Sequence, residues 1–278
     1  MGTPDPGMND RALARLAERV EVAGLTDLFA AAPRDLAADL GLSIAPAADG
    51  IAIRADGLPG FIFNRAVGFG FDAPLDEPAL DRIIEFYRGA AQFSIQPCPF
   101  ASPREIPRWL EARGHHAYVH WVKWVRSTDS PPAASTDLRI ERIPPEHASH
   151  FAELAGRTFQ MERAAAWLAR VVGRPRWTHY VVYDAETPVG AATLFVDGEA
   201  GNLLSAATLE SHRGRGIQSA LIARRIHDAA RAGCRWVVVE TAEDRPDKPA
   251  PSYRNQSRAG FRILYRRPSH VWPKPVKA

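Results

Sequence analysis

The stretch SHRGRGIQSALIARRIHDAARAGCRWVVVE, residues 211–240, decides the fold. It opens with alternating arginine and glycine at residues 213–216. Apolar residues then recur at helical spacing through residues 217–232, with charged residues on the opposite face. Gly233 ends this helix, and the run WVVV has the composition of a buried strand. The sequence therefore predicts a helix and a strand that are entered through a glycine-arginine turn.

This turn, residues 213–216, has the features of an anion site. The first backbone N–H groups of a helix lack partners, and the helix dipole favours negative charge there. Glycines let a ligand approach the backbone closely, and arginines supply forked hydrogen-bond donors. We therefore expect a phosphate site. The alternative is a tight turn whose arginines are only solvated.

Two familiar nucleotide motifs do not fit the turn. The P-loop pattern G-x-x-x-x-G-K-[ST] is absent, because no lysine follows the glycines. The Rossmann pattern G-x-G-x-x-G matches only at Gly214 and Gly216, since its third glycine falls on Ser219. A phosphate site at this turn would therefore have to belong to a motif other than these two.

The chain divides into two halves with similar patterns. Residues 127–137, STDSPPAASTD, contain several breakers and no apolar periodicity, which predicts a linker. Residues 138–278 predict the order β-α-α-β-β-β-α-β-α-β. Residues 8–126 end on a similar alternation of helices and strands. This repetition favours a duplicated α/β fold, although generic alternation produces similar patterns.

Two motifs of the second half resemble the GNAT superfamily of N-acyltransferases. The run from Arg213 to Gln218 resembles its acyl-CoA signature, R/Q-x-x-G-x-G/A, with Gln218 at the last position. The later SYRNQSRAGF, residues 252–261, resembles its second motif, an Asn-bearing helix that ends in Gly-Phe. The element order also matches, over residues 138 to about 270. The resemblance implies a mixed, mostly antiparallel sheet flanked by helices, in two similar domains.

The resemblance also implies a site for acetyl-CoA as co-substrate. Backbone N–H groups from Arg213 to Gln218 would hold the CoA pyrophosphate, and an N–H near Ala207 and Thr208 would stabilise the oxyanion. Ser252 is a plausible N-cap of the second motif's helix. The expected cofactor-binding residues are Ala207, Thr208, Arg213, Gly214, Arg215, Gly216, Ile217, Gln218, Ser252 and Asn255.

Amide formation from a thioester needs a neutral amine and a proton for the leaving sulfur. A lysine-like amine has a pKa of about 10.4, so a base or a desolvating pocket must help. Glu240 is the candidate base, and the alternative for Glu240 is a strand-end carboxylate paired with an arginine. Many family members carry a tyrosine acid four residues before the Gly of Gly-Phe. Gln256 stands there and cannot donate a proton as an acid, so Tyr253 or a water would substitute, or the acid is absent.

The first half lacks the arginines of the turn. Asp72, Asp76 and Glu77 stand where Arg213 and Arg215 stand in the second half. Carboxylates at that position would repel a pyrophosphate. We expect residues 8–126 to be a degenerate copy without a CoA site, which packs on the catalytic half and walls the acceptor pocket.

Composition excludes several other classes. The net charge of +3 is too small and too mixed in sign to indicate nucleic acid binding. The two cysteines, Cys98 and Cys234, have no metal-like spacing and favour a reducing compartment. Nothing approaches the roughly 20 apolar residues of a membrane span. We expect a cytoplasmic protein without metal, nucleic acid or membrane partners.

The sequence as a whole predicts an N-acetyltransferase. It would transfer an acetyl or other short acyl group from CoA to the amine of a small molecule, by direct attack in a ternary complex. No cysteine or serine has a recognisable activating partner, which disfavours a covalent intermediate. Two alternatives stay open: a non-catalytic acyl-CoA-binding or sensor protein, motivated by Gln256, and a protein acetyltransferase, which would need an open acidic groove.

Overall fold

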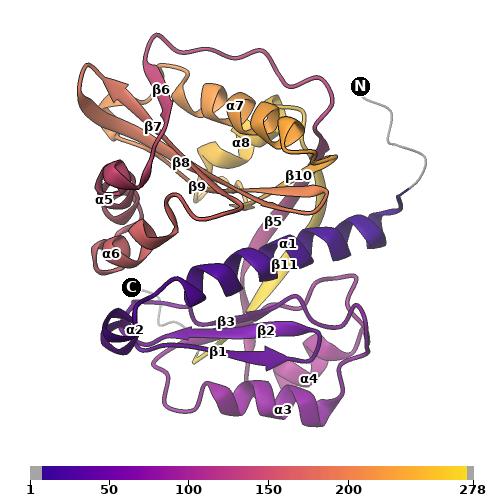
Figure 1. Cartoon of the computed structure of the whole chain (residues 1–278). Helices are drawn as coiled ribbons and strands as arrows, with labels where there is room; N and C mark the ends of the chain where they lie inside the picture. The colour runs from indigo at the N-terminus through magenta and orange to yellow at the C-terminus, as the bar shows by residue number, and fades with distance from the viewer. Residues whose placement is uncertain (1–7, 274–278) are drawn as a thin grey trace.

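Within residues 8–273, which the computed structural model describes, eleven strands form one sheet (Figure 1). They are β1 (Leu42–Ala47), β2 (Gly50–Ala55), β3 (Arg65–Val67), β4 (Phe93–Ile95), β5 (His116–Ser127), β6 (Arg139–Arg142), β7 (Trp177–Asp184), β8 (Thr187–Asp197), β9 (Ala200–Thr208), β10 (Trp236–Ala242) and β11 (Arg262–Trp272). Their order is β1-β2-β3-β4-β11-β5-β10-β9-β8-β7-β6. The pairs β3–β4 and β9–β10 are parallel, and the other neighbours are antiparallel. The expected mixed, mostly antiparallel sheet is confirmed.

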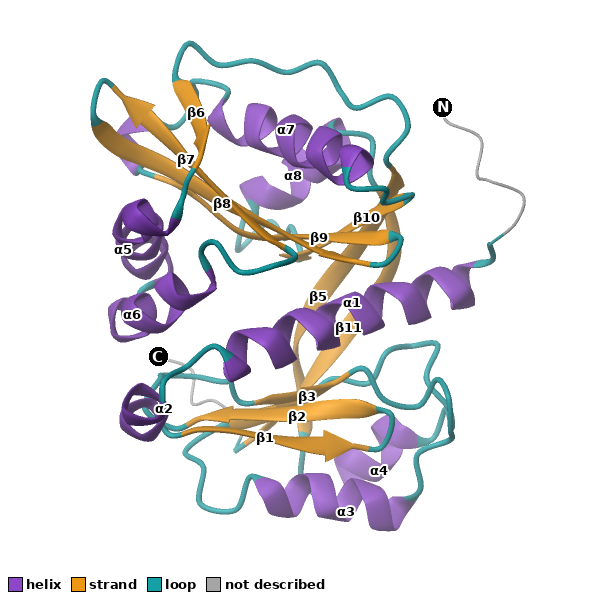
Figure 2. Cartoon of the chain, in the orientation of Figure 1, coloured by secondary structure: helices purple, strands orange, loops and turns teal. Residues whose placement is uncertain are grey.

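Helices cover both faces of this sheet (Figure 2). They are α1 (Asp10–Ala30), α2 (Arg34–Leu40), α3 (Glu77–Phe86), α4 (Ile106–Ala112), α5 (Ala148–Phe159), α6 (Ala165–Leu168), α7 (Ile217–Arg231) and α8 (Pro251–Arg258). In the second half, α7 and α8 lie on one face, and α5 and α6 lie on the other. The order of strands and helices expected for residues 138–278 is the observed order.

The two halves exchange their last strands. β5 ends the first half, yet it pairs with β10 of the second half, from Trp236–Ser127 to Ala242–Trp121. β11 ends the second half, yet it pairs with β4 of the first half. β5 and β11 also pair with each other at the centre of the sheet. The halves therefore share one sheet, whereas the sequence had suggested two domains that only pack together.

Strand order is the same on either side of this centre. The series β1-β2-β3-β4 followed by β11 mirrors the series β7-β8-β9-β10 followed by β5, and β6 is added at one edge. In each series the third and fourth strands are the parallel pair. This correspondence supports the inference that the fold is duplicated.

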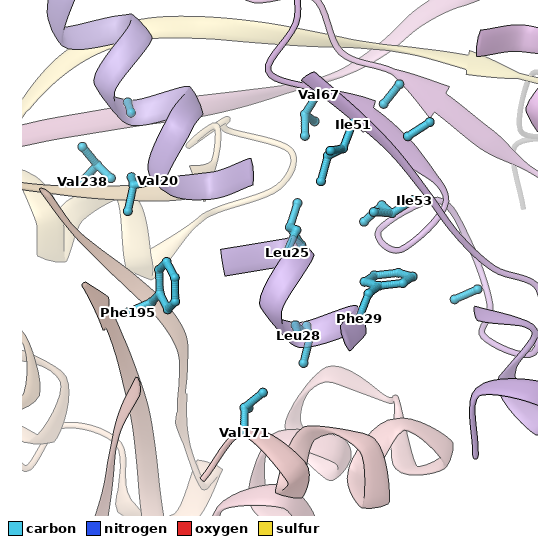
Figure 3. Packing of buried hydrophobic residues seen from close by; sticks show 14 of the residues in the cluster. Val20, Leu25, Leu28, Phe29, Ile51, Ile53, Val67, Val171, Phe195 and Val238 are labelled. Atoms are coloured by element: carbon cyan, nitrogen blue, oxygen red, sulfur yellow. The ribbon is translucent and has the colours of Figure 1, made fainter. Parts of the chain in front are cut away.

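The core that joins the halves is built around α1, which the sequence analysis had not identified. The Asn9 side chain caps α1 by accepting a hydrogen bond from the Ala12 N–H at 2.9 Å. The apolar face of α1 is buried against strands of both halves. Figure 3 shows this packing for Val20, Leu25, Leu28, Phe29, Ile51, Ile53, Val67, Phe195 and Val238. Burial of this face from both sides holds the junction together.

One expected helix boundary was wrong. Helix α8 begins at Pro251 with Ala250 at the N-cap position, so Ser252 lies inside the helix and does not cap it. Proline is favoured at the first helical position, because its φ angle is suited to the helix and its missing N–H is not needed there. The Asp244 carboxylate accepts a hydrogen bond from the backbone N–H of Ala250 at 2.7 Å.

We predict that the chain unfolds in one cooperative transition, because neither half can keep its sheet without the strand of the other. Urea unfolding followed by tryptophan fluorescence and by circular dichroism should give superimposable curves. Two separated transitions would show that the halves are independent domains and would contradict the exchange of β5 and β11.

Buried histidines predict acid sensitivity. Burial lowers the pKa of His179 to about 3 and those of His115 and His270 to about 4, so the folded protein holds them neutral. The unfolded chain binds these protons below about pH 6.5, so their contribution to stability is present above that pH and is lost as the pH falls. As the pH falls below about 6.5, each of these three histidines should lower the free energy of unfolding by up to about 1.4 kcal/mol per pH unit. Urea titrations at pH 7.5 and 5.0 measure this slope, and equal stabilities would contradict it.

Candidate functional site

The site is organised by two parallel strands that separate. β9 and β10 pair only from Ala200–Trp236 to Leu203–Val239. Beyond that point β9 stays with β8, and β10 stays with β5. Helices α7 and α8 follow β9 and β10 along the chain. The carboxyl ends of diverging parallel strands are a common place for a ligand in α/β proteins.

A bulge in β9 lies just before the expected oxyanion position. The pairing of β8 with β9 shifts between Ala191–Ala207 and Thr193–Leu204. Ser205, inside this irregularity, has a φ of 47°. A left-handed serine in a strand re-aims the backbone beside it, which is typical of functional sites. The sequence carries no signal for this bulge, because no glycine marks it.

The glycine-arginine turn has the conformation that its glycines allow. Gly214 and Gly216 have φ angles of 82° and 75°, in the left-handed region. Gly216 is the N-cap of α7, and among the described residues no side chain caps this helix. The first N–H groups of α7 therefore lack intrahelical partners and carry the positive end of the helix dipole. Gln218 donates to the Thr208 hydroxyl at 2.7 Å, which ties the turn to the end of β9.

Both arginines of the turn are engaged by carboxylates. Arg213 is exposed and lies 3.3 Å from Glu210. Arg215 lies 2.5 Å from Asp137 and 2.8 Å from Asp184. Hydrogen bonds from Arg215 lower the pKa of both aspartates. The backbone N–H of Arg213 donates to the carbonyl of Glu210 at 3.2 Å, whereas Gly214 and Gly216 are exposed.

The second motif brings Tyr253 against the exchanged strand. Tyr253 is half-buried on α8, with its ring edge-on to Trp124 of β5 at 4.6 Å between centroids. Trp124 in turn donates from Nε1 to the Thr241 hydroxyl of β10 at 2.9 Å. Asn255 is half-buried on the same helix, and Ser252 is exposed. The first half therefore supplies the side chain on which the candidate acid rests.

Gln256 differs from its neighbours on α8. Its side chain is only 5% exposed, and within residues 8–273 its Oε1 accepts no hydrogen bond. The position at which many family members carry an acid is thus buried and holds no proton donor of that kind.

Glu240 lies in a buried cluster of charges. Its Oε2 is 2.5 Å from Arg267 and 3.1 Å from Lys123, and its Oε1 is 3.6 Å from Arg65. These three cations hold the carboxylate in ion pairs, and Arg267 also donates a hydrogen bond to it. The geometry therefore favours the alternative interpretation, a strand-end carboxylate paired with arginine, over a general base.

Helix α1 contributes the other carboxylates of this cluster. Glu21 contacts Lys123, Arg65 and Arg267, and Glu18 contacts Arg267. Burial raises the pKa of Glu21, but its three cations lower it further and leave it well below the usual range. Sequence analysis missed this cluster, because its members are contributed by α1, β3, β5, β10 and β11. It lies under α1, where the two halves meet.

In the first half, the helix that corresponds to α7 is α3, and a side chain caps its N-terminus. Asp76 is the N-cap of α3 and accepts from the Ala79 N–H at 2.7 Å. Asp72 pairs with Arg15, and Glu77 pairs with Arg113. The carboxylates that the sequence placed at this position thus have partners within the protein.

The turn before α3 is closed as well. The carboxylate of Asp49 accepts hydrogen bonds from the backbone N–H groups of Gly70, Phe71 and Asp72 at 2.5, 2.7 and 2.6 Å. Ser102, from the loop after β4, donates its N–H to the carbonyl of Gly70 at 2.8 Å. In the first half a carboxylate therefore bonds the N–H groups of this turn, whereas in the second half the aspartates contact the Arg215 side chain.

Comparison with known proteins agrees with this geometry. Residues 144–250 match the model of the acetyltransferase (GNAT) family. The structure is similar to a GCN5-related N-acetyltransferase from Kribbella flavida, with a TM-score of 0.63, 15% identity, and coverage of 94% of this chain and 96% of the other. It is also similar to a tandem GNAT protein from the clavulanic acid biosynthesis pathway, with a TM-score of 0.55, 18% identity, and coverage of 94% and 98%.

Residues 144–250 thus match the acetyltransferase (GNAT) family model, and the fold of the whole chain is similar to that of a tandem GNAT protein. The family match supports acyl transfer from CoA in general. The sequence matches no curated protein. None of the helices in the described part of the chain is long and apolar enough to cross a membrane.

If Glu240 is an ion-pair partner, Glu240→Gln should lower the free energy of unfolding by about 3 kcal/mol, because Arg267 and Lys123 lose a buried counter-charge. Glu243→Gln is the matched control, since Glu243 pairs with exposed Arg266 at 3.0 Å and should contribute less than about 1 kcal/mol. Urea unfolding measures both variants. Wild-type stability in Glu240→Gln would contradict the ion-pair assignment and return Glu240 to the role of base.

Proposed function

We propose that this protein is an N-acyltransferase that moves an acetyl or other short acyl group from CoA to the amine of a small molecule. The observation that carries the proposal is the uncapped N-terminus of α7 behind Gly214 and Gly216, next to the point where β9 and β10 separate. The GNAT match over residues 144–250 supports it independently.

In this proposal the backbone N–H groups from Arg213 to Gln218 bind the CoA pyrophosphate, as helix N-termini do with other phosphates. Gln218 fixes the turn against Thr208 through its side-chain amide. Asn255 and Ser252, on α8, would border the rest of the CoA molecule.

The chemistry would rely on position and on backbone dipoles. The N–H groups near Ala207, which follow the bulge at Ser205, would stabilise the oxyanion of the tetrahedral intermediate. Holding acyl donor and amine together supplies a large part of the rate by itself. Tyr253 would give its proton to the leaving sulfur, and its ring is oriented by Trp124. With Glu240 in ion pairs, the amine would lose its proton to water.

We further propose that residues 8–126 bind no CoA. Asp49 and Asp76 already accept hydrogen bonds from N–H groups of the corresponding turn and helix, and both carboxylates would repel a pyrophosphate there. The contribution of the first half is instead structural, through β5 and α1. One acetyl-CoA per chain is the expected stoichiometry.

The second candidate, a non-catalytic acyl-CoA sensor, is favoured by one observation, the buried Gln256 at the position of the usual acid. Release of free thiol from acetyl-CoA that depends on an added amine would support the enzyme. Tight binding without turnover across a broad panel of amines would support the sensor.

Acetyl-CoA binding by calorimetry tests the site. We expect micromolar affinity with one site per chain, and at least a tenfold loss in the double variant Arg213→Ala/Arg215→Ala, because two charge-assisted contacts to phosphate are removed. The control is Arg88→Ala, which removes an exposed arginine of the first half that pairs only locally with Glu85.

No binding by the wild type would mean that the glycine-arginine turn is only a turn, and the proposed function would fall. A stoichiometry of two would contradict the assignment of the first half.

A further inference from the structure

The linker between the two halves, residues 127–137, lies against the glycine-arginine turn. The Thr136 hydroxyl donates to the carbonyl of Arg215 at 2.8 Å. The Ser135 carbonyl approaches Gly216 so closely that a Cβ there would lie 2.6 Å from it. Gly216 therefore serves two purposes, since it permits the left-handed φ and makes room for the linker.

The linker also supplies one of the two carboxylates on Arg215. Asp137 lies 2.5 Å from the guanidinium, and Asp184, at the end of β7, lies 2.8 Å from it on another nitrogen. Arg215 is still 34% exposed. Asp184 is shared with His212, whose Nε2 is 3.2 Å away. Among the described residues, the Arg215 guanidinium thus contacts carboxylates and not the backbone of the turn.

From these contacts we infer that the linker sets the affinity of the turn for acyl-CoA through two opposing contributions. Thr136 holds the Arg215 carbonyl and thereby keeps the neighbouring N–H groups directed outward to the pyrophosphate. Asp137, together with Asp184, competes with the pyrophosphate for the Arg215 guanidinium. This inference rests on the proposed function, because it concerns the same anion.

The physical basis of the competition is simple. A guanidinium that binds two carboxylates must release at least one of them to form a forked contact with phosphate. Each carboxylate also repels a pyrophosphate bound a few ångströms away. Because these groups are exposed, the effect of either carboxylate is modest and decreases with salt.

Neighbouring residues of the linker should therefore change affinity in opposite directions. In calorimetry with acetyl-CoA at low ionic strength, Asp137→Asn should bind about threefold more tightly, since a screened charge is removed. Thr136→Val keeps the shape of the side chain but loses the hydrogen bond, and should bind about fivefold more weakly. Asp129→Asn, in the same linker but bonded to Ser127, should leave the affinity unchanged.

A double-mutant cycle separates the clamp on Arg215 from a general effect of charge. In an Arg215→Ala background, Asp137→Asn should no longer tighten binding. Full tightening in that background, or no tightening in the wild-type background, would overturn the role of Asp137. Unchanged affinity in Thr136→Val would overturn the role of Thr136.

These outcomes are distinct from failure of the proposed function. If the wild type does not bind acetyl-CoA at all, the proposed function and this inference fail together. If the wild type binds but the linker variants behave as the Asp129→Asn control does, the inference alone fails. Thermal midpoints of Asp137→Asn and Asp129→Asn should match the wild type, since these two side chains are exposed.

Discussion

The structure depends on the antiparallel pairing of β5 with β11 at the centre of the sheet. Each strand ends one half of the chain and is placed next to the other half, so neither half is complete alone. The pairing also brings Lys123 of β5 beside Arg267 of β11. Helix α1 supplies Glu21, which pairs with Lys123, and Glu18, which pairs with Arg267. Removal of any one partner would leave a buried charge uncompensated, so every member of the cluster must be in position.

The duplicated fold shows one turn with two different outcomes. In the second half, Asp184 binds the side chain of Arg215. In the first half, Asp49 binds the backbone N–H groups themselves. Under the proposed function, the Asp49 carboxylate occupies the position in the first half that corresponds to the phosphate position in the second half. The same architecture can thus be an anion site or a structural connection, depending on where one aspartate is directed.

Local signals made much of this predictable from the sequence. Gly214 and Gly216 adopt the positive φ that alternating glycines suggest, and the apolar periodicity of residues 217–232 corresponds to α7. The order of elements in the second half followed from similar patterns. Ser252 is the second residue of the helix and not its N-cap, because the preference of Pro251 for the first helical position outweighed the capping tendency of serine.

Long-range features were not predictable in this way. The pattern of β5 reads as a strand whichever neighbour it has, so its exchange into the other half leaves no mark on the sequence. Glu240 reads equally well as a base or as an ion-pair partner until Arg65, Lys123 and Arg267 are placed around it. The bulge at Ser205 has no glycine to announce it. These features depend on residues that are far apart in the chain.

A crystal structure with bound acetyl-CoA is the most direct test of the central claim, that only the second half offers an anion site at a helix N-terminus. The account predicts one CoA per chain, with its pyrophosphate on the N–H groups at the start of α7 and with Asp49 still bonded to the turn before α3. A CoA bound at α3, or one whose pyrophosphate lies away from residues 213–218, would contradict it.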